Sequence, residues 1–324
     1  MIPSDRRWRI LEHDPAGGAW NMAVDEALLS SVEENPVFRI YGWNEWTLSL
    51  GRFQDPEGDL LPAFLADPSF PVVRRMTGGG AILHGGELTY SLVLHQDDLG
   101  TGDVKESFRL LCGFLHRFYR KLGLESLFAG DAAALITGTY GSVESPGVTG
   151  VDGPIDGRRV SGAAQPPALG LKTPFCYAGR EIYDVVIRGM AHSDGAMPAS
   201  GFSKIGGNAQ RRFRKVIFQH GSIPIVLNRM GLQRIFPEKD LPPGGDITSL
   251  VDLGAAEQPD AGAGSGRNRL VTLLREAFTE LAAEDLHTDR VETDTMTEKE
   301  RAAAASLENE VYRSTGWTFH RTRS

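Results

Sequence analysis

The stretch Arg74-Arg75-Met76-Thr77-Gly78-Gly79-Gly80-Ala81-Ile82-Leu83-His84 joins two β-prone segments through three consecutive glycines. Glycine lets the backbone approach a ligand closely, and successive N–H groups in such a loop can form an anion-binding nest. A plain hairpin turn is the alternative, although a two-residue turn needs fewer glycines. We therefore predict that the glycine loop, residues 78–80, contacts a ligand with an anionic or carbonyl group.

The segments around this loop predict the fold class. Short β-prone segments separated by turn residues are typical of strands, and they occupy residues 37–41, 47–50, 72–75, 81–83, 88–94, 182–187 and 216–226. Apolar residues at helical spacing predict amphipathic helices over 19–32 and 105–122. Because strict βαβ alternation is missing, we expect an α+β fold with a mostly antiparallel or mixed sheet flanked by helices.

The chain is predicted to form one domain over residues 1–324. Residues of about 137–171 are rich in Gly, Pro, Ser and Ala without periodicity, which predicts a flexible insertion. The C-terminal segment, about 244–324, is predicted to be helical, with helices over 267–283 and 298–312. Thr297 and Glu300 have capping-box spacing at the start of the second of these helices.

Composition excludes several classes of protein. The net charge of -8 argues against nonspecific nucleic-acid binding, because the phosphate backbone favours basic surfaces. No apolar run of about 18 residues or signal-like core is present, so we expect a cytoplasmic protein without membrane partners. Two cysteines are too few for a disulfide framework or a Cys-based zinc site, and the histidines show no metal-ligand spacing. No metal is predicted.

Two further positions could carry chemistry. Lys204 begins the stretch Lys204-Ile205-Gly206-Gly207-Asn208-Ala209-Gln210, where an ammonium on a constrained backbone could stabilise charge on a carbonyl oxygen. A solvated surface lysine is the alternative. Cys176 could act as a thiolate nucleophile beside such a cation, or could be a buried apolar residue between two aromatics. Cys112 lies on an apolar helix face and is predicted to belong to the core.

A run of cations follows the second glycine-containing stretch. Arg211, Arg212, Arg214 and Lys215 place four cations in five positions of an acidic chain. We predict a docking patch for an acidic protein partner, because local charge complementarity raises association rates and sets orientation. A solvated strand end is the alternative.

Several blocks, in order along nearly the whole chain, resemble the family of lipoate-protein ligases and octanoyltransferases. Besides the stretches around the glycine loop and Lys204, they are Trp20-Asn21-Met22-Ala23-Val24-Asp25-Glu26-Ala27, Arg39-Ile40-Tyr41-Gly42-Trp43, Leu48-Ser49-Leu50-Gly51-Arg52-Phe53-Gln54, Gln219-His220-Gly221-Ser222 and Tyr312-Arg313-Ser314-Thr315-Gly316-Trp317. The resemblance implies a catalytic domain of the biotin and lipoate protein ligase type with an apolar tunnel for an acyl chain.

The resemblance is closer to the transferase branch. Cys176 precedes the pair Tyr183-Asp184 by seven residues, as the nucleophilic cysteine of the transferases does, and Glu87-Leu88-Thr89-Tyr90-Ser91 is also similar to that branch. The ligases usually add a C-terminal domain that is not evident in this sequence, although Gly80 is more typical of the ligases. An ATP-dependent lipoate ligase and a non-catalytic lipoyl-binding relative are therefore the alternatives.

The resemblance also implies roles for residues and partners. Cys176 and Lys204 are the expected catalytic residues, and the expected substrate-binding residues are Arg75, Thr77, Gly78, Gly79, Gly80, His84, Gly207, Asn208, Ala209 and His220. An octanoyl or lipoyl group would move from an acyl carrier protein through a cysteine thioester to a lipoyl-domain lysine, as in the glycine cleavage H protein or a 2-oxoacid dehydrogenase E2. No cofactor is expected, since ATP and Mg²⁺ enter only in the ligase alternative.

Overall fold

The computed structural model describes residues 6–99, 101–137, 169–170, 172–189, 198, 200–258 and 264–323. The predicted flexible insertion, about 137–171, lies almost wholly outside these residues. No helix in the described ranges is both long enough and apolar enough to span a membrane.

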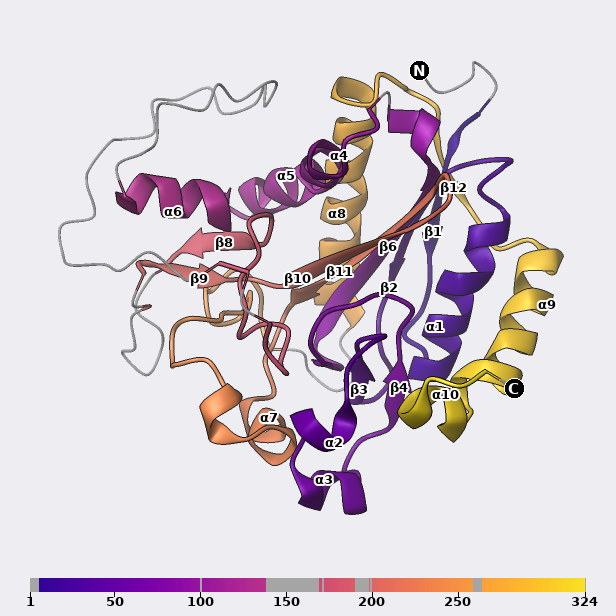
Figure 1. Cartoon of the computed structure of the whole chain (residues 1–324). Helices are drawn as coiled ribbons and strands as arrows, with labels where there is room; N and C mark the ends of the chain where they lie inside the picture. Colours follow the sequence, from indigo (N-terminus) through magenta and orange to yellow (C-terminus); the bar gives the residue numbers. More distant parts are fainter. Residues whose placement is uncertain are drawn as a thin grey trace.

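A mixed six-stranded sheet runs through the centre of the molecule (Figure 1). Its strands, in spatial order, are β10 (Gly207–Phe213), β11 (Val216–Pro224), β6 (Glu87–His95), β2 (Val37–Tyr41), β1 (Trp8–Glu12) and β12 (Val291–Asp294). Neighbours from β10 to β2 are antiparallel, whereas β1 is parallel to both β2 and β12. This sheet with its flanking helices confirms the predicted α+β fold.

Two small sheets of three strands each complete the β-structure of the described residues. The first pairs β4 (Val72–Arg74), β3 (Thr47–Leu50) and β5 (Ile82–His84), and the second pairs β7 (Ser126–Phe128), β8 (Val185–Arg188) and β9 (Phe202–Lys204). The glycine loop therefore connects β4 to β5, and Lys204 ends β9. The two small sheets therefore carry the glycine loop, His84 and Lys204. The other predicted residues on strands, Gly207, Asn208, Ala209 and His220, lie on β10 and β11 of the central sheet.

Helices pack on both faces of the central sheet. The helical segments are α1 (Gly18–Ala27), η1 (Leu28–Ser30), α2 (Pro56–Asp59), α3 (Pro62–Ala66), η2 (Gln96–Leu99), α4 (Val104–Leu111), α5 (Gly113–Lys121), α6 (Ala129–Thr137), α7 (Arg229–Ile235), η3 (Glu238–Asp240), α8 (Gly264–Glu284), α9 (Glu298–Leu307), η4 (Glu308–Tyr312) and α10 (Thr315–His320). Alternate strand residues point to opposite faces. Phe38 therefore packs in the core beneath α5 and α8, whereas Val37 packs with α1 and α9.

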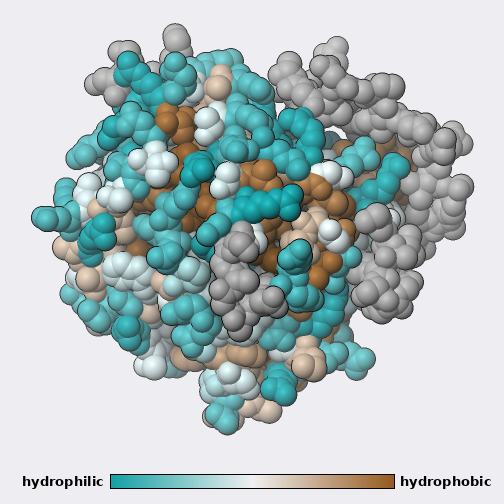
Figure 2. Space-filling view, turned by 180° about the vertical axis from the view of Figure 1, so that it is seen from behind, coloured by the Kyte–Doolittle hydropathy of each residue, from teal (hydrophilic) through white to brown (hydrophobic). Residues whose placement is uncertain are grey.

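Polar residues cover most of the molecular face turned away in Figure 1, with hydrophobic side chains visible between them (Figure 2).

Element boundaries differ from the predicted ones by a few residues, as is usual for sequence patterns. The predicted helix over 105–122 is interrupted between α4 and α5 at Cys112. A Cβ on Gly113 would lie 2.9 Å from a Leu281 methyl, so glycine there permits the close approach of α5 to α8.

The C-terminal segment differs from the prediction in one element. Residues 244–324 are mostly helical in the described parts, but Val291–Asp294 forms strand β12 at the sheet edge. Apart from Val291 its side chains are polar, and none of the four is fully buried, so it lacks the apolar alternation that predicts a strand. The two helices predicted in this segment are present as α8 and as α9 with η4, whereas strand β12 was not predicted.

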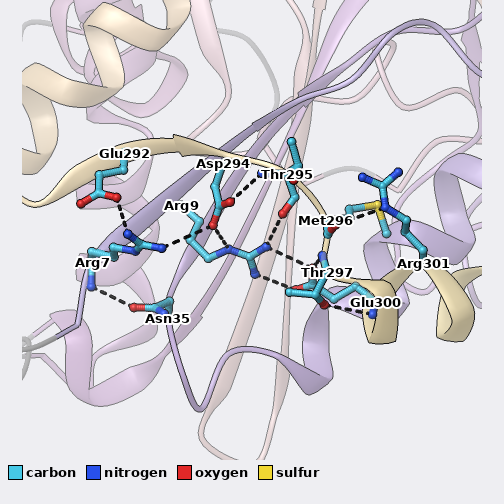
Figure 3. A network of polar contacts seen from close by, with 10 residues as sticks. All are labelled: Arg7, Arg9, Asn35, Glu292, Asp294, Thr295, Met296, Thr297, Glu300 and Arg301. Atoms are coloured by element: carbon cyan, nitrogen blue, oxygen red, sulfur yellow. Dashed lines mark hydrogen bonds and ion pairs between the residues drawn. The ribbon is translucent and has the colours of Figure 1, made fainter.

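Charged side chains attach this C-terminal segment to β1 (Figure 3). Arg9 donates hydrogen bonds to Asp294 at 2.9 Å and to Glu300 at 2.6 Å, and Arg7 pairs with Glu292. The predicted capping box of Thr297 and Glu300 is present. Burial alone would raise the pKa of Glu300, but hydrogen bonds, chiefly from Arg9, lower it to about 2, so the pair stays ionised at neutral pH.

Candidate active site

A cavity of about 720 Å³ opens beside the glycine loop and strand β10. Every predicted catalytic and substrate-binding residue lines it except Thr77, which is fully buried behind the loop. The volume is within the range typical of small-ligand sites. The structure thus brings together residues that are up to 145 positions apart, from Arg75 to His220.

The side chain of Arg75 holds the glycine loop through hydrogen bonds to its backbone. Its buried guanidinium donates to the carbonyl oxygens of Gly78 at 2.8 Å and Gly80 at 2.7 Å. Gly79 adopts a φ of 93°, a conformation that strongly favours glycine. Among the described residues, no acceptor takes a hydrogen bond from the backbone N–H groups of these three glycines. The loop therefore directs the carbonyls of Gly78 and Gly80 towards Arg75 and leaves its amides available to a ligand.

The segment that carries Cys176 packs directly on this loop. The Ala81 amide donates to the Pro174 carbonyl at 2.7 Å, and the Cys176 amide donates to the Ala81 carbonyl at 3.0 Å. A Cβ on Gly80 would lie 2.4 Å from the Thr173 carbonyl oxygen and 2.8 Å from the Cys176 nitrogen. Gly80 must therefore be glycine for the two segments to meet in this way.

Two glycines of the loop, Gly80 and Gly78, should respond differently to substitution by alanine. We expect Gly80→Ala to lower the free energy of unfolding by about 1–3 kcal/mol, the usual cost of overpacking, because its Cβ would overlap backbone atoms. Gly78→Ala is the matched control, since its Cβ would meet no atom within 4 Å, and should change stability by less than about 0.5 kcal/mol. Urea unfolding at pH 7 measures both values. Equal losses in the two variants would contradict the packing of residues 173–176 on Gly80.

Cys176 is a half-buried free thiol at the cavity wall. A Cβ on Gly207 would lie 3.1 Å from the Cys176 sulfur, so glycine leaves room for that atom. Burial lowers the pKa of Arg75, and the negative charge of an ionised Cys176 would raise it. The thiol and the guanidinium are therefore within electrostatic reach of each other.

Lys204 fixes the segment that follows the cysteine. Its buried Nζ donates to the carbonyls of Cys176 at 3.0 Å and Gly179 at 2.7 Å, and to Asp184 Oδ2 at 2.7 Å. An ammonium has three N–H donors, so all of them are engaged. Asp184 also accepts a hydrogen bond from the Glu181 amide at 2.7 Å. Lys204 is thus a buried, paired cation beside Cys176 and not a solvated surface lysine.

The two predicted histidines line the cavity with different partners. His84 Nε2 lies 2.8 Å from Ser49 Oγ and its Nδ1 lies 2.5 Å from Glu87 Oε1, while its ring stacks on Trp43 with centroids 4.0 Å apart. His220 Nε2 lies 2.6 Å from Thr77 Oγ1. Burial, followed by the charge of Arg75, lowers the pKa of His220 well below its usual range, so His220 is neutral.

Gly207, Asn208 and Ala209 begin β10 at the cavity wall. The Tyr90 hydroxyl donates to Asn208 Oδ1, which orients the amide. Ala209 pairs with His220 across the antiparallel ladder. The β10–β11 ladder therefore holds this part of the cavity wall in a fixed register.

The cation run divides along the hairpin of β10 and β11. Arg211 donates to the Met76 carbonyl at 2.8 Å, next to the glycine loop, whereas Arg212 donates to Ser107 Oγ at 2.6 Å. Arg214 makes the turn at a φ of 58°, and Lys215 lies 3.6 Å from Asp97. The run is thus not one surface, and its role in docking stays a prediction.

Several residues at the site were not predicted from the sequence. Gln54 Nε2 donates to the Pro174 carbonyl at 2.8 Å and supports the cysteine segment. Met22, Tyr41 and Trp43 line one part of the cavity. All four belong to blocks that carry the family resemblance, but nothing local in the sequence links them to Cys176. Together, a thiol, unengaged amides and a buried cation form an arrangement suited to acyl transfer.

Comparisons with known proteins agree with this arrangement. A family model described as the lipoyl protein ligase A/B catalytic domain matches residues 18–168. The octanoyltransferase LipM of Kyrpidia tusciae is 31% identical over 319 residues, which cover 93% of this chain and 94% of that protein. The octanoyltransferase LipM of Oceanobacillus iheyensis is also 31% identical, over 68% of this chain and 65% of that protein.

Solved structures share the fold at lower identity. A Thermoplasma acidophilum protein described as a lipoate protein ligase with bound lipoic acid superposes with a TM-score of 0.63 at 20% identity, over 97% of this chain and 99% of that one. That likeness supports the fold alone, whereas the sequence relatives support the branch. The chain therefore belongs to the family of lipoyl protein ligase A/B catalytic domains, on the octanoyltransferase branch.

Proposed function

We propose that this protein moves an octanoyl group from an acyl carrier protein to a lysine of a lipoyl-domain protein, through a thioester on Cys176. The observation that carries the proposal is the Cys176 thiol, which lines a 720 Å³ cavity together with the unengaged amides of the glycine loop. A thiolate nucleophile beside unengaged backbone donors is the arrangement that acyl transfer requires.

In the first step, the Cys176 thiolate attacks the carbonyl carbon of the donor thioester. The amides of residues 78–80 donate to the oxygen as negative charge develops on it. The new carbon–sulfur bond forms as the bond to the carrier thiol breaks, and that thiolate takes up the proton lost by Cys176. The octanoyl group then rests on Cys176.

In the second step, a neutral lysine amine of the acceptor attacks the Cys176 thioester. The nitrogen–carbon bond of the amide forms, the thiolate of Cys176 leaves, and the proton of the amine passes to it or to solvent. No phosphate bond is broken, so we propose that the reaction needs no nucleotide, cofactor or metal. Docking makes both steps effectively unimolecular, which supplies much of the rate.

Lys204 contributes charge and position. Its Nζ holds the Cys176 and Gly179 carbonyls, and so orients the cysteine segment against the glycine loop. Because all three donors are engaged, Lys204 can reach a substrate oxygen only by exchanging one of these carbonyls for it. Its charge lies beside the reacting thiol in either arrangement, at a buried position where water screens it little.

Apolar side chains favour an acyl chain in the cavity. Met22, Tyr41, Trp43 and Ile82 line it together with the ring of His84. Burying roughly seven methylenes at ~0.8 kcal/mol each contributes about 5 kcal/mol of binding free energy. This is enough to select for chain length.

The experiment that tests the proposal mixes the protein with octanoyl carrier protein, without ATP and without acceptor. We expect the intact mass to rise by one octanoyl group, and neutral hydroxylamine to remove it, because the linkage is a thioester. Adding a lipoyl domain should then transfer the group to that domain.

The ligase alternative predicts a different result. A ligase would leave the enzyme unmodified by the carrier, and would modify the lipoyl domain only when octanoate or lipoate and ATP with Mg²⁺ are supplied. Absence of acyl transfer under both conditions would indicate a non-catalytic lipoyl-binding relative. Each outcome contradicts the proposed thioester.

A further inference from the structure

Two arginines flank the glycine loop next to the cavity. The backbone amide of Arg52 donates to the Thr77 carbonyl at 2.7 Å, and the side chain of Arg211 donates to the Met76 carbonyl at 2.8 Å. Both residues are therefore held against the turn that leads into Gly78. They come from the loop after β3 and from β10, 159 positions apart.

These two guanidiniums are not neutralised within the described part of the chain. Neither forms an ion pair there with a carboxylate, in contrast to Arg323, which pairs with Glu26 at 2.6 Å. Arg52 and Arg323 lie 5.4 and 4.6 Å from the Trp317 ring centroid. Burial and then the charges of Arg52 and Arg323 lower the pKa of Arg211, whereas the charge of Glu26 raises it, so Arg211 lies within electrostatic reach of both other cations.

An exposed aromatic residue lies beside this charge. Phe53 follows Arg52, lines the cavity and is 72% exposed. A large apolar side chain that projects next to unpaired cations offers a contact for a partner with both acidic and apolar groups. We call Arg52, Phe53 and Arg211 the mouth surface.

We propose that the mouth surface docks an acidic carrier protein that delivers the acyl thioester to this cavity. The inference rests on the proposed function, since a carrier-bound thioester has to approach Cys176 with its protein still attached. The chain carries a net charge of -8 and would repel an acidic carrier at long range. Unpaired cations beside the cavity offset this repulsion where docking is productive.

Carboxylates that line the same cavity allow a second test, in which a charge of the opposite sign is removed. Asp55 and Asp59 also line it, and Asp55 is exposed. If the partner is acidic, removing the negative charge of Asp55 should strengthen its docking, whereas removing the positive charges of Arg52 and Arg211 should weaken it. A partner that recognised only shape would not respond in opposite directions.

The test compares two donors in acylation of Cys176, followed by intact mass. For octanoyl carrier protein, we expect Arg52→Glu/Arg211→Glu to lower kcat/KM by about tenfold or more, and Asp55→Asn to raise it by about twofold. For octanoyl-N-acetylcysteamine, which carries no protein, the kcat/KM of both variants should stay within about twofold of the wild-type value. Raising salt from about 50 to 500 mM should reduce the difference between wild type and the double variant with the carrier.

Lys299→Glu is the matched control, because Lys299 is an exposed cation on α9 and the substitution makes the same change in charge as each of the two arginine substitutions. It should leave kcat/KM for the carrier within about twofold of wild type. Equal losses with both donors would show that Arg52 and Arg211 only support the glycine loop, and no loss with the carrier would place docking elsewhere. Either result overturns the inference while leaving the proposed function intact. Failure of wild type to accept octanoyl from either donor would overturn the proposed function, and the docking role with it.

Discussion

Cys176→Ala is expected to lower the rate of octanoyl transfer by about 10⁴-fold or more, because removing a covalent nucleophile removes both steps that depend on it. The half-buried thiol makes no hydrogen bond that alanine would leave unpaired among the described residues, so the fold should persist. The measurement is the rate at which a lipoyl domain gains octanoyl from octanoyl carrier protein. Urea unfolding of the same variant establishes that it is folded.

Cys112→Ala is the control, since the chain has only two cysteines. Burial raises the pKa of Cys112, which keeps it a thiol, and its sulfur accepts a hydrogen bond from Gln219 at 3.3 Å. Its replacement should lower stability by about 1–2 kcal/mol through a small cavity, while transfer stays within about twofold. Transfer by Cys176→Ala at a tenth or more of the wild-type rate would contradict covalent catalysis, because it would mean that the thiol lowers the activation free energy by no more than roughly 1.4 kcal/mol.

The glycine loop could be predicted from the sequence because its chemistry is local. Gly79 needs its positive φ and Gly80 needs its missing Cβ, and both requirements leave a mark at single positions. The contacts that make the loop functional are not local. Arg75 directs its carbonyls inward, and the cysteine segment, almost 100 residues later, packs on Ala81.

The contacts of the cation run, residues 211–215, could not be predicted from the sequence either, because they too join distant segments. Alternation along a strand implies that Arg211 and Arg212 point to opposite sides. It does not say that Met76 lies on one side and Ser107 on the other. Arg52, which lies near Arg211 in the structure, is 159 positions away and belongs to no charge run.

Strand β12 could not be predicted for a related reason. It is short and mostly polar, and the Arg9 side chain that contacts Asp294 and Glu300 beside it lies almost 300 residues earlier. Long-range ion pairs leave no periodicity in the sequence. Strands β2 and β6, in contrast, are rich in β-branched, aromatic and other apolar residues, which predicted them.

Lys204→Met should lower both stability and transfer. The substitution leaves the Asp184 carboxylate buried without its cation and the carbonyls of Cys176 and Gly179 without their donor. Breaking one half of a buried ion pair costs about 3–5 kcal/mol of unfolding free energy. Loss of the cation from the acyl site should lower kcat/KM for transfer by about 10²–10³-fold.

A double variant separates the two effects. In Lys204→Met/Asp184→Asn both charges are removed, and the asparagine oxygen can still accept the hydrogen bond from Glu181. Replacing a buried pair by neutral groups is often close to neutral for stability, so most of the lost unfolding free energy should return. Transfer should stay at the level of Lys204→Met, because the cation that acts on the reacting carbonyl is still missing. Urea unfolding at pH 7 and initial rates with octanoyl carrier protein measure the two quantities on the same preparations. If transfer returned together with stability, Lys204 would serve only to hold the cysteine segment, and the glycine-loop amides with Arg75 would supply all the charge stabilisation.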